Sequence, residues 1–148
     1  MAVIKKPLDE IYFEIIDAIK ERLNNDERLK EINTITFGER MRIGKLLSPV
    51  IWIVPEPYQP SLEGGHTAQH DIAFNFVTLV KGNDPETCLK EAQRLALVTY
   101  DVIIQDRTLN GLVSDVRPTR VDPAYEAGQS TQLYWSSVQI VFRLKRRE

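Results

Sequence analysis

The fold is decided by the stretch DIAFNFVTLV at residues 71–80. Large apolar side chains alternate along it with smaller or polar ones, and this period of two is typical of a β-strand with one face in a core. Ile72, Phe74 and Phe76 share the face that we expect to be buried, whereas Asp71 lies on the other face. The other predicted elements are the ones that would pack around this strand.

Further strands are predicted before and after this stretch in the sequence. They follow from alternating or continuous apolar runs at residues 34–37, 50–54, 112–121 and 134–144. Pro118 interrupts the third of these runs, and a polar loop through Gly128 leads to the last. Asn110-Gly111, just before the third run, is typical of a tight turn.

Two amphipathic helices complete the pattern. One has Asp9 as a candidate N-cap and ends near residues 24–26, with apolar side chains every four residues at Ile11, Ile15, Ile19 and Leu23. The other starts at Asp84-Pro85-Glu86 and runs to about Gln105. We therefore expect an α+β fold, with one mixed, mainly antiparallel sheet and both helices packed on one of its faces.

Composition limits the function classes. The chain has 148 residues, of which 43% are hydrophobic, so we expect one domain over residues 1–148 that needs no metal or disulfide to fold. Its one cysteine excludes an internal disulfide framework. The formal charge of -2 argues against nucleic-acid binding through bulk positive charge. No apolar run approaches the roughly 20 residues that span a bilayer, so no membrane partner is expected.

A long projecting loop is predicted at about residues 55–69. It is rich in proline and glycine, and its large apolar side chains are Tyr58 and Leu62. No lysine or arginine occurs from residue 46 to residue 80, whereas three basic residues precede this segment: Arg40, Arg42 and Lys45. A basic edge beside an acidic arm suits head-to-tail contacts between identical subunits, and ordinary surface scatter is the alternative. Tyr58, Leu62 and the three basic residues are therefore the candidate interface.

The second face of the sheet is predicted to be apolar as well. Trp52, Val77, Leu79 and Trp135 are all expected to point toward it. A cluster of this kind would be too apolar for bare solvent. We therefore expect self-association.

Catalytic motifs are scarce. His66, His70 and Asp71 could contribute to a metal site only if they converged, although a strand would hold the two imidazoles about 13 Å apart. Cys88 is expected in the first turn of the second helix, where the helix dipole could lower its pKa, but a small buried residue is the plainer interpretation. No phosphate-binding or dinucleotide motif is present. We expect no enzyme and no cofactor, and a metal-dependent enzyme using His66, His70 and Asp71 is kept as an alternative.

The second half of the chain resembles a known protein family. The segments LALVTYDVIIQDRTLNGLVSDVRP at 95–118, VDPAYEAG at 121–128 and YWSSVQIVFRL at 134–144 are similar to tail terminator and tail-completion proteins of long-tailed phages. The resemblance implies an α+β subunit of a hexameric ring at the head-proximal end of the tail tube, which ends tube growth and joins the tail to the head connector. It implies the tail tube protein and the connector as partners, and a location in the virion after assembly in the host cytoplasm.

Other roles remain open at this point. A neck or head-completion protein, or a minor tail protein of the same fold, would have a similar sequence. A cellular adaptor that uses the sheet to bind peptides is a further alternative.

The charge pattern predicts how such a ring would face DNA. A channel through which DNA slides should not hold phosphates, so a neutral or acidic lumen is expected. Part of the segment without basic residues, with Glu56, Glu63 or Asp71, is predicted to face the bore. The basic end of the chain, residues 145–147, is predicted to face away from it.

Overall fold

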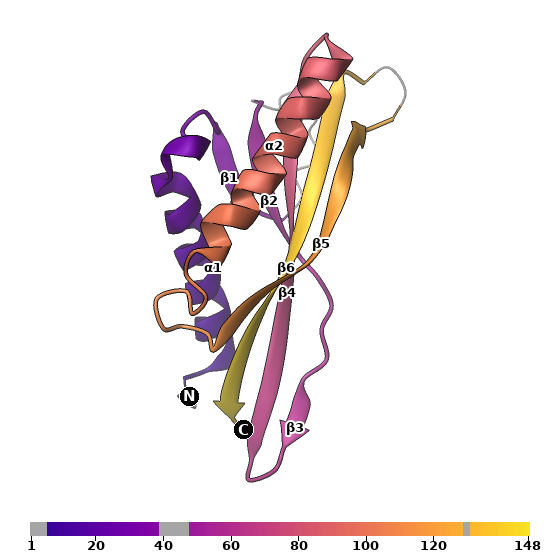
Figure 1. Cartoon of the computed structure of the whole chain (residues 1–148). Helices are drawn as coiled ribbons and strands as arrows, with labels where there is room; N and C mark the ends of the chain where they lie inside the picture. The colour runs from indigo at the N-terminus through magenta and orange to yellow at the C-terminus, as the bar shows by residue number, and fades with distance from the viewer. Residues whose placement is uncertain (1–5, 39–47, 129–130) are drawn as a thin grey trace.

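The computed structural model describes residues 6–38, 48–128 and 131–148 (Figure 1). Its helices are α1 (Leu8–Asn25), the short 3-10 helix η1 (Glu27–Leu29) and α2 (Pro85–Ile104). Its strands are β1 (Thr34–Phe37), β2 (Val50–Pro55), β3 (Ser61–Glu63), β4 (Thr67–Lys81), β5 (Asp115–Glu126) and β6 (Leu133–Arg147). Within this described part, no helix combines the length and the apolar character needed to cross a membrane.

One mixed sheet organises the molecule. Its strand order is β1-β2-β4-β6-β5, and β3 pairs separately with β4. The β1–β2 pair is parallel, and all the other pairs are antiparallel. The predicted α+β class with a mainly antiparallel sheet is confirmed. β4 and β6 are the longest strands and pair along their whole length, from Thr67↔Arg147 to Lys81↔Leu133.

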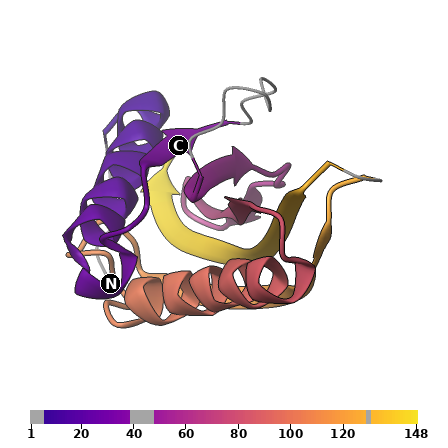
Figure 2. The same cartoon turned by 90° about the horizontal axis from the view of Figure 1, so that it is seen from above.

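The main core lies between the helices and one face of the sheet. Figure 2 shows both helices outside the curve of the sheet. The predicted apolar row of α1 is buried, and so is the predicted face of β4, including Ile72, Phe74 and Phe76. Phe142 of β6 packs on Phe74, with ring centroids 5.8 Å apart. The alternation at residues 71–80 therefore predicted the buried face correctly.

The two helices begin differently. At α2, Asp84 is the N-cap and accepts a hydrogen bond from the Thr87 backbone N–H at 3.2 Å, and Pro85 occupies the first helical position, as the sequence predicts. At α1, the predicted cap at Asp9 was wrong. The helix begins at Leu8, and Asp9 lies in its first turn, where a carboxylate is favoured by the helix dipole.

The predicted loop at residues 55–69 is shorter in the structure. Residues 61–63 form β3, which pairs with the first residues of β4. The backbone turns through Gly65 and His66, both with positive φ. Because β3 and β4 satisfy each other's backbone groups, this segment is a hairpin and only residues 56–60 lack regular structure.

The predicted polar loop after residue 121 is also different, because β5 continues to Glu126. It does so with register shifts between Pro118 and Arg120 and between Asp122 and Tyr125. β5 is an edge strand with β6 on one side only. Proline is tolerated there because its missing N–H removes no bond from the unpaired side.

The second sheet face carries its own apolar cluster. Trp52, Val77 and Leu79 are buried in it, and Trp135 packs against them. One chain already reduces Trp52 to 4% exposure. The sequence-based reason for self-association, that these side chains need a partner to cover them, therefore fails. Self-association stays a prediction and has to rest on another surface.

Candidate subunit interface at the end of the sheet

One end of the sheet extends past helix α2 (Figure 1). It consists of β3, residues 67–71 of β4 and residues 143–147 of β6, which are paired in the order β3-β4-β6. We call this part the sheet tip. It contains or borders most of the residues that the sequence singles out.

Tyr58 is engaged within its own chain. Its hydroxyl is hydrogen-bonded to His70 Nδ1 at 2.9 Å, and the two rings meet edge to face with centroids 5.7 Å apart. Burial raises the pKa of Tyr58, and the nearby Glu148 carboxylate adds to this. The side chain thus fixes residues 56–60 to the tip of the same subunit, and the role of Tyr58 as an anchor for a neighbouring subunit stays a prediction.

Leu62 is the most exposed large apolar side chain of the described residues, with 84% of its surface accessible. It lies at the centre of β3, opposite Ala68 of β4. Its role at a subunit interface remains a prediction. The basic residues of the predicted interface, Arg40, Arg42 and Lys45, lie outside the described residues.

The acidic residues predicted for a channel are paired with bases. Glu63 Oε2 lies 2.9 Å from Lys145 Nζ, and Asp71 Oδ1 lies 2.8 Å from Arg143 Nε. The strand register explains both pairs. Asp71 lies directly opposite Arg143. Glu63 lies opposite Thr67, which in turn lies opposite Arg147, so Glu63 is on the same face of the sheet as Lys145 and the other odd-numbered residues of β6. The prediction that the acids and the basic end of the chain face different ways was wrong for Glu63 and Lys145. Glu56 makes a backbone hydrogen bond to Ala73 at 3.0 Å.

The charged ladder continues across β5. Asp115 accepts hydrogen bonds from Arg107 at 2.9 Å and from Arg117 at 3.0 Å. Burial would raise the pKa of Asp115, but the hydrogen bonds from these two guanidinium groups and from the Val116 backbone together outweigh it, and the pKa is lowered. Asp115 thus extends the row of paired charges from the sheet tip onto β5, with two arginines sharing its one carboxylate.

The substitution Asp71→Asn tests this ladder. The hydrogen bond from Arg143 lowers the Asp71 pKa against the opposing effect of burial. The pair therefore stabilises the fold above the ordinary carboxyl pKa of about 3.9, and this contribution is lost as the pH falls through the lowered folded-state pKa. We expect Asp71→Asn to lower the free energy of unfolding at neutral pH by less than about 1 kcal/mol, because the pair is partly exposed.

The difference in unfolding free energy between Asp71→Asn and the unsubstituted protein should shrink as the pH falls below about 3.9. Urea unfolding from about pH 7 down to about pH 2.5 measures it. Asp17→Asn on the exposed side of α1 is the control, since Asp17 makes no ion pair with the described residues. An Asp71→Asn deficit that stays constant over this pH range would contradict the role given to the pair.

The residues of the alternative metal site do not converge. His66 lies exposed in the turn with φ 66°, so it is not the extended residue that the sequence predicts. His70 is 1% exposed on the helix-facing side, and Asp71 is on the opposite face of the strand. Across the described part of the chain, no group of three histidine, cysteine, aspartate or glutamate residues could hold a metal ion.

Cys88 is a buried core residue. Burial raises the pKa of its thiol, and Asp84 adds to the effect. The interpretation as a small buried residue is therefore confirmed, and the alternative of a pKa lowered by the helix dipole is wrong. The close approach of Gly82 reflects the same packing, because a Cβ at that position would lie 2.6 Å from Cys88 Sγ.

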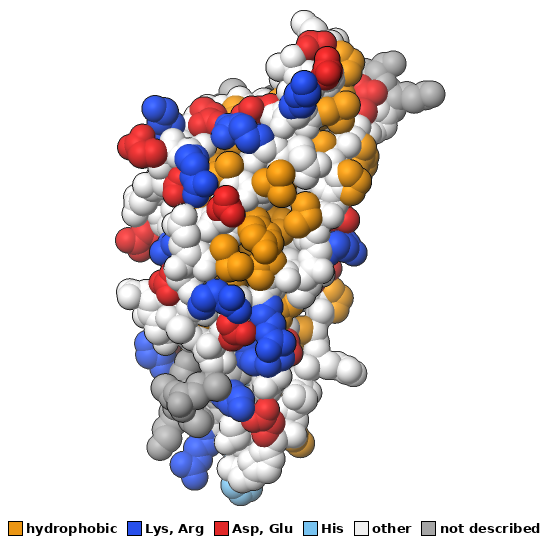
Figure 3. All heavy atoms as spheres, viewed as in Figure 1, with side chains coloured by type: hydrophobic (Ala, Val, Ile, Leu, Met, Phe, Trp, Pro, Cys, Tyr) orange, Lys and Arg blue, Asp and Glu red, His pale blue; other side chains and the backbone are white. Residues whose placement is uncertain are grey.

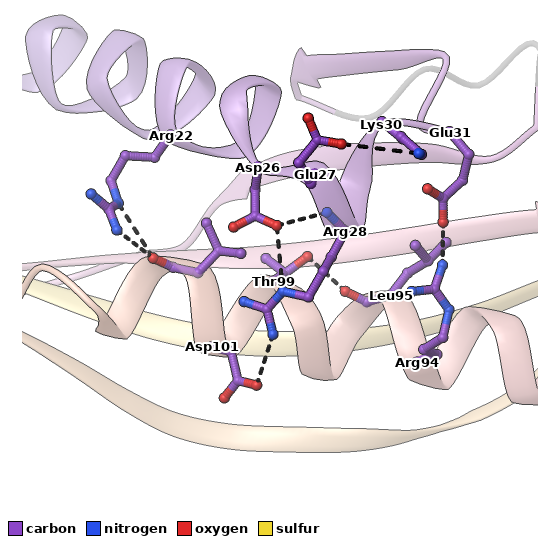
Figure 4. A network of polar contacts seen from close by, with 11 residues as sticks. Arg22, Asp26, Glu27, Arg28, Lys30, Glu31, Arg94, Leu95, Thr99 and Asp101 are labelled. Carbon is purple, nitrogen blue, oxygen red and sulfur yellow. Dashed lines mark hydrogen bonds and ion pairs between the residues drawn. The ribbon is translucent and has the colours of Figure 1, made fainter.

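Ion pairs join the end of α1 and η1 to α2 (Figure 4). Arg28 Nη1 lies 3.4 Å from Asp101 Oδ2, and Arg94 pairs with Glu31. Arg22 Nη2 donates to the Val102 carbonyl at 2.8 Å, which satisfies an acceptor near the end of α2. These contacts fix α1 and η1 to α2.

Helix α2 also has an apolar outer surface. Figure 3 shows apolar side chains gathered over its middle, with charged groups around them. Leu97 of α2 is exposed there, and Val121 and Tyr125 of β5 are also exposed apolar side chains. This surface is a second possible contact region.

Comparison of the chain with models of protein families and with curated protein sequences finds no match.

The sequence-based predictions missed Arg143 as a residue of this site and gave Lys145 the opposite orientation from Glu63, beside which it lies. The alternation of Arg143 and Lys145 with apolar residues places them on one face of the last strand. The acidic residues with which they pair are determined by the register of β6 against β4, and this register cannot be predicted from the sequence pattern.

Proposed function

We propose that this protein is a structural subunit of a long-tailed phage virion. In this proposal it forms a ring, hexameric by resemblance, at the head-proximal end of the tail tube, where it ends tube growth and joins the tail to the head connector. The observation that carries the proposal is the sheet tip, which extends past α2 and presents the exposed Leu62. The resemblance of residues 95–118 and 134–144 to tail-completion proteins supports the same role.

The charges of the tip suit a channel for DNA. Duplex DNA carries one phosphate charge per roughly 1.7 Å, and a ring multiplies any unpaired lysine or arginine in its lumen. Glu63 and Asp71 balance Lys145 and Arg143 within each subunit. A lumen lined by these two pairs would be close to neutral, as expected from the sequence, provided that Arg147 on the same face is also paired in the assembled ring.

Electron microscopy of the purified protein tests the proposal. At high concentration, and in mixtures with purified tail tubes, we expect rings and tubes capped at one end. The free subunit can be monomeric at low concentration, because assembly depends on concentration and on the tube as template. A protein that stays monomeric and caps no tube in excess tube protein would refute the proposal. Binding to a purified connector without binding to tubes would indicate a neck protein instead.

A further inference from the structure

The sheet tip has an unpaired strand edge on each side. β5 pairs with β6 only as far as Asp115↔Arg143, whereas β6 continues to Arg147 against β4. Residues 144–147 of β6 therefore have no strand on their outer edge among the described residues. On the other side, β3 pairs with β4 alone.

The peptide groups on these edges can be assigned from the hydrogen bonds that are present. The Ser114 N–H donates to the Arg143 carbonyl at 2.7 Å, so the peptide groups of Arg143 point to the outer side of β6. Peptide groups alternate along a strand, so the N–H and C=O of Lys145 and Arg147 point to the same side. They form the open edge of β6.

The same reasoning assigns the edge of β3. The Glu56 N–H donates to the Ala73 carbonyl at 3.0 Å, so odd-numbered residues of β4 direct their peptide groups toward β2 and β3. The partners of Thr67 and Gln69 on β3 are Glu63 and Ser61. Between them, Leu62 directs its N–H and C=O outward.

We propose that β3 of one subunit adds to the open edge of β6 in the next subunit. This inference rests on the proposed self-assembly and names the contact that makes it. β3 and β6 both run antiparallel to β4, so repeating the order β3-β4-β6 places β3 of the next copy parallel to β6. In a parallel ladder one residue bonds to two residues of its partner. Leu62 N–H donates to the Lys145 carbonyl, and Arg147 N–H donates to the Leu62 carbonyl.

The side chains favour a second copy as the occupant. With Leu62 opposite Arg146, Glu63 of one subunit lies opposite Arg147 of the next, and opposite charges in facing positions stabilise a strand pair. Arg147 has no ion-pair partner among the described residues, whereas Glu63 already faces Lys145 in its own chain. Leu62 is 84% exposed in the single chain. In the assembled pair, the aliphatic part of the Arg146 side chain would cover it.

The proposed contact between β3 and β6 is limited to a few residues. Pro60 precedes β3 and has no N–H, so the ladder cannot extend in that direction. Such short edges resist uncontrolled strand addition. The two edges differ from each other, so the contact is head-to-tail and closes into a ring when the rotation per subunit allows it.

A cysteine pair tests the contact directly. In a Cys88→Ala background, Leu62→Cys and Arg146→Cys are combined, and the protein is oxidised at assembly concentration. Within one chain both positions flank Ala68 of β4, so they are about two strand spacings, roughly 9.6 Å, apart. A disulfide requires Cα atoms within about 7 Å, so a 62–146 disulfide has to join two chains. Mass spectrometry of mixed light and 15N-labelled protein identifies it.

We expect the 62–146 link in high yield, together with a ladder of covalent multimers in non-reducing gels. The matched control combines Leu62→Cys with Asp17→Cys on the exposed side of α1. Equal yields from the two pairs would show random collision and would overturn the inference.

A backbone variant tests the hydrogen bonds separately. Leu62→Pro removes the outward N–H and leaves the β3–β4 hydrogen bonds in place, whereas Leu62→Ala removes only the side chain. We expect Leu62→Pro to need about tenfold more protein than Leu62→Ala for half-maximal assembly. Rings that form equally in both variants, with no 62–146 link, would refute the strand contact and leave the proposed function standing. A protein that forms no ring and caps no tube would refute both.

Discussion

The substitution Phe74→Ala is expected to lower the free energy of unfolding by about 3–5 kcal/mol. Phe74 has no accessible surface, and its ring contacts those of Tyr12, Phe76 and Phe142. It therefore joins α1 to the two longest strands. Truncation loses the transfer energy of the ring and leaves a cavity that three fixed neighbours cannot fill. Urea unfolding, followed by circular dichroism, measures the loss.

Phe13→Ala is the matched control for Phe74→Ala. Phe13 lies on the next position of α1 to Tyr12, contacts Tyr12 and Phe37, and is 54% exposed. Since half of its surface already meets water, we expect a loss of about 1 kcal/mol or less. Equal losses for the two variants would contradict the position of the core between the helices and β4.

Tyr58→Phe is expected to lower the free energy of unfolding by about 1–3 kcal/mol, although it removes a single oxygen atom. His70 is 1% exposed, and its Nδ1 is bonded to the Tyr58 hydroxyl. Its Nε2 lies 3.5 Å from Glu148 Oε1 and makes no hydrogen bond within the described residues. Without the hydroxyl, neither ring nitrogen is hydrogen-bonded, and the desolvation cost of a buried polar group is left uncompensated.

A double-mutant cycle with His70→Leu isolates this contact. Tyr58→Phe should cost clearly less in the His70→Leu background, because no buried imidazole then loses its partner. Ring formation by Tyr58→Phe should match that of the unsubstituted protein at temperatures where both are folded. An assembly defect without a stability defect would instead support the predicted role of Tyr58 as an intersubunit anchor.

The candidate site was only partly predictable from the sequence. The exposed Leu62 could be identified because it is an apolar residue among prolines and glycines. The inward direction of Tyr58 could not, since it depends on His70, which lies twelve positions along the chain. Likewise, a run of 35 residues without lysine or arginine, 46–80, suggested an acidic surface, but β6 supplies the missing bases across the sheet.

The sequence by itself determined the local features of this protein. The alternation at residues 71–80, the four-residue spacing in α1 and the Asp84-Pro85 start of α2 depend on backbone geometry within a few residues, so each could be predicted without the rest of the chain. The tertiary structure decided the strand order, the pairing of β3 with β4 and the register of β6. Apolar periodicity requires only that one face be buried and is satisfied by several partners and by any register shift of two residues. Packing of the whole core selects among these, and that selection brings Asp71 to Arg143 and leaves the edges of β3 and β6 open.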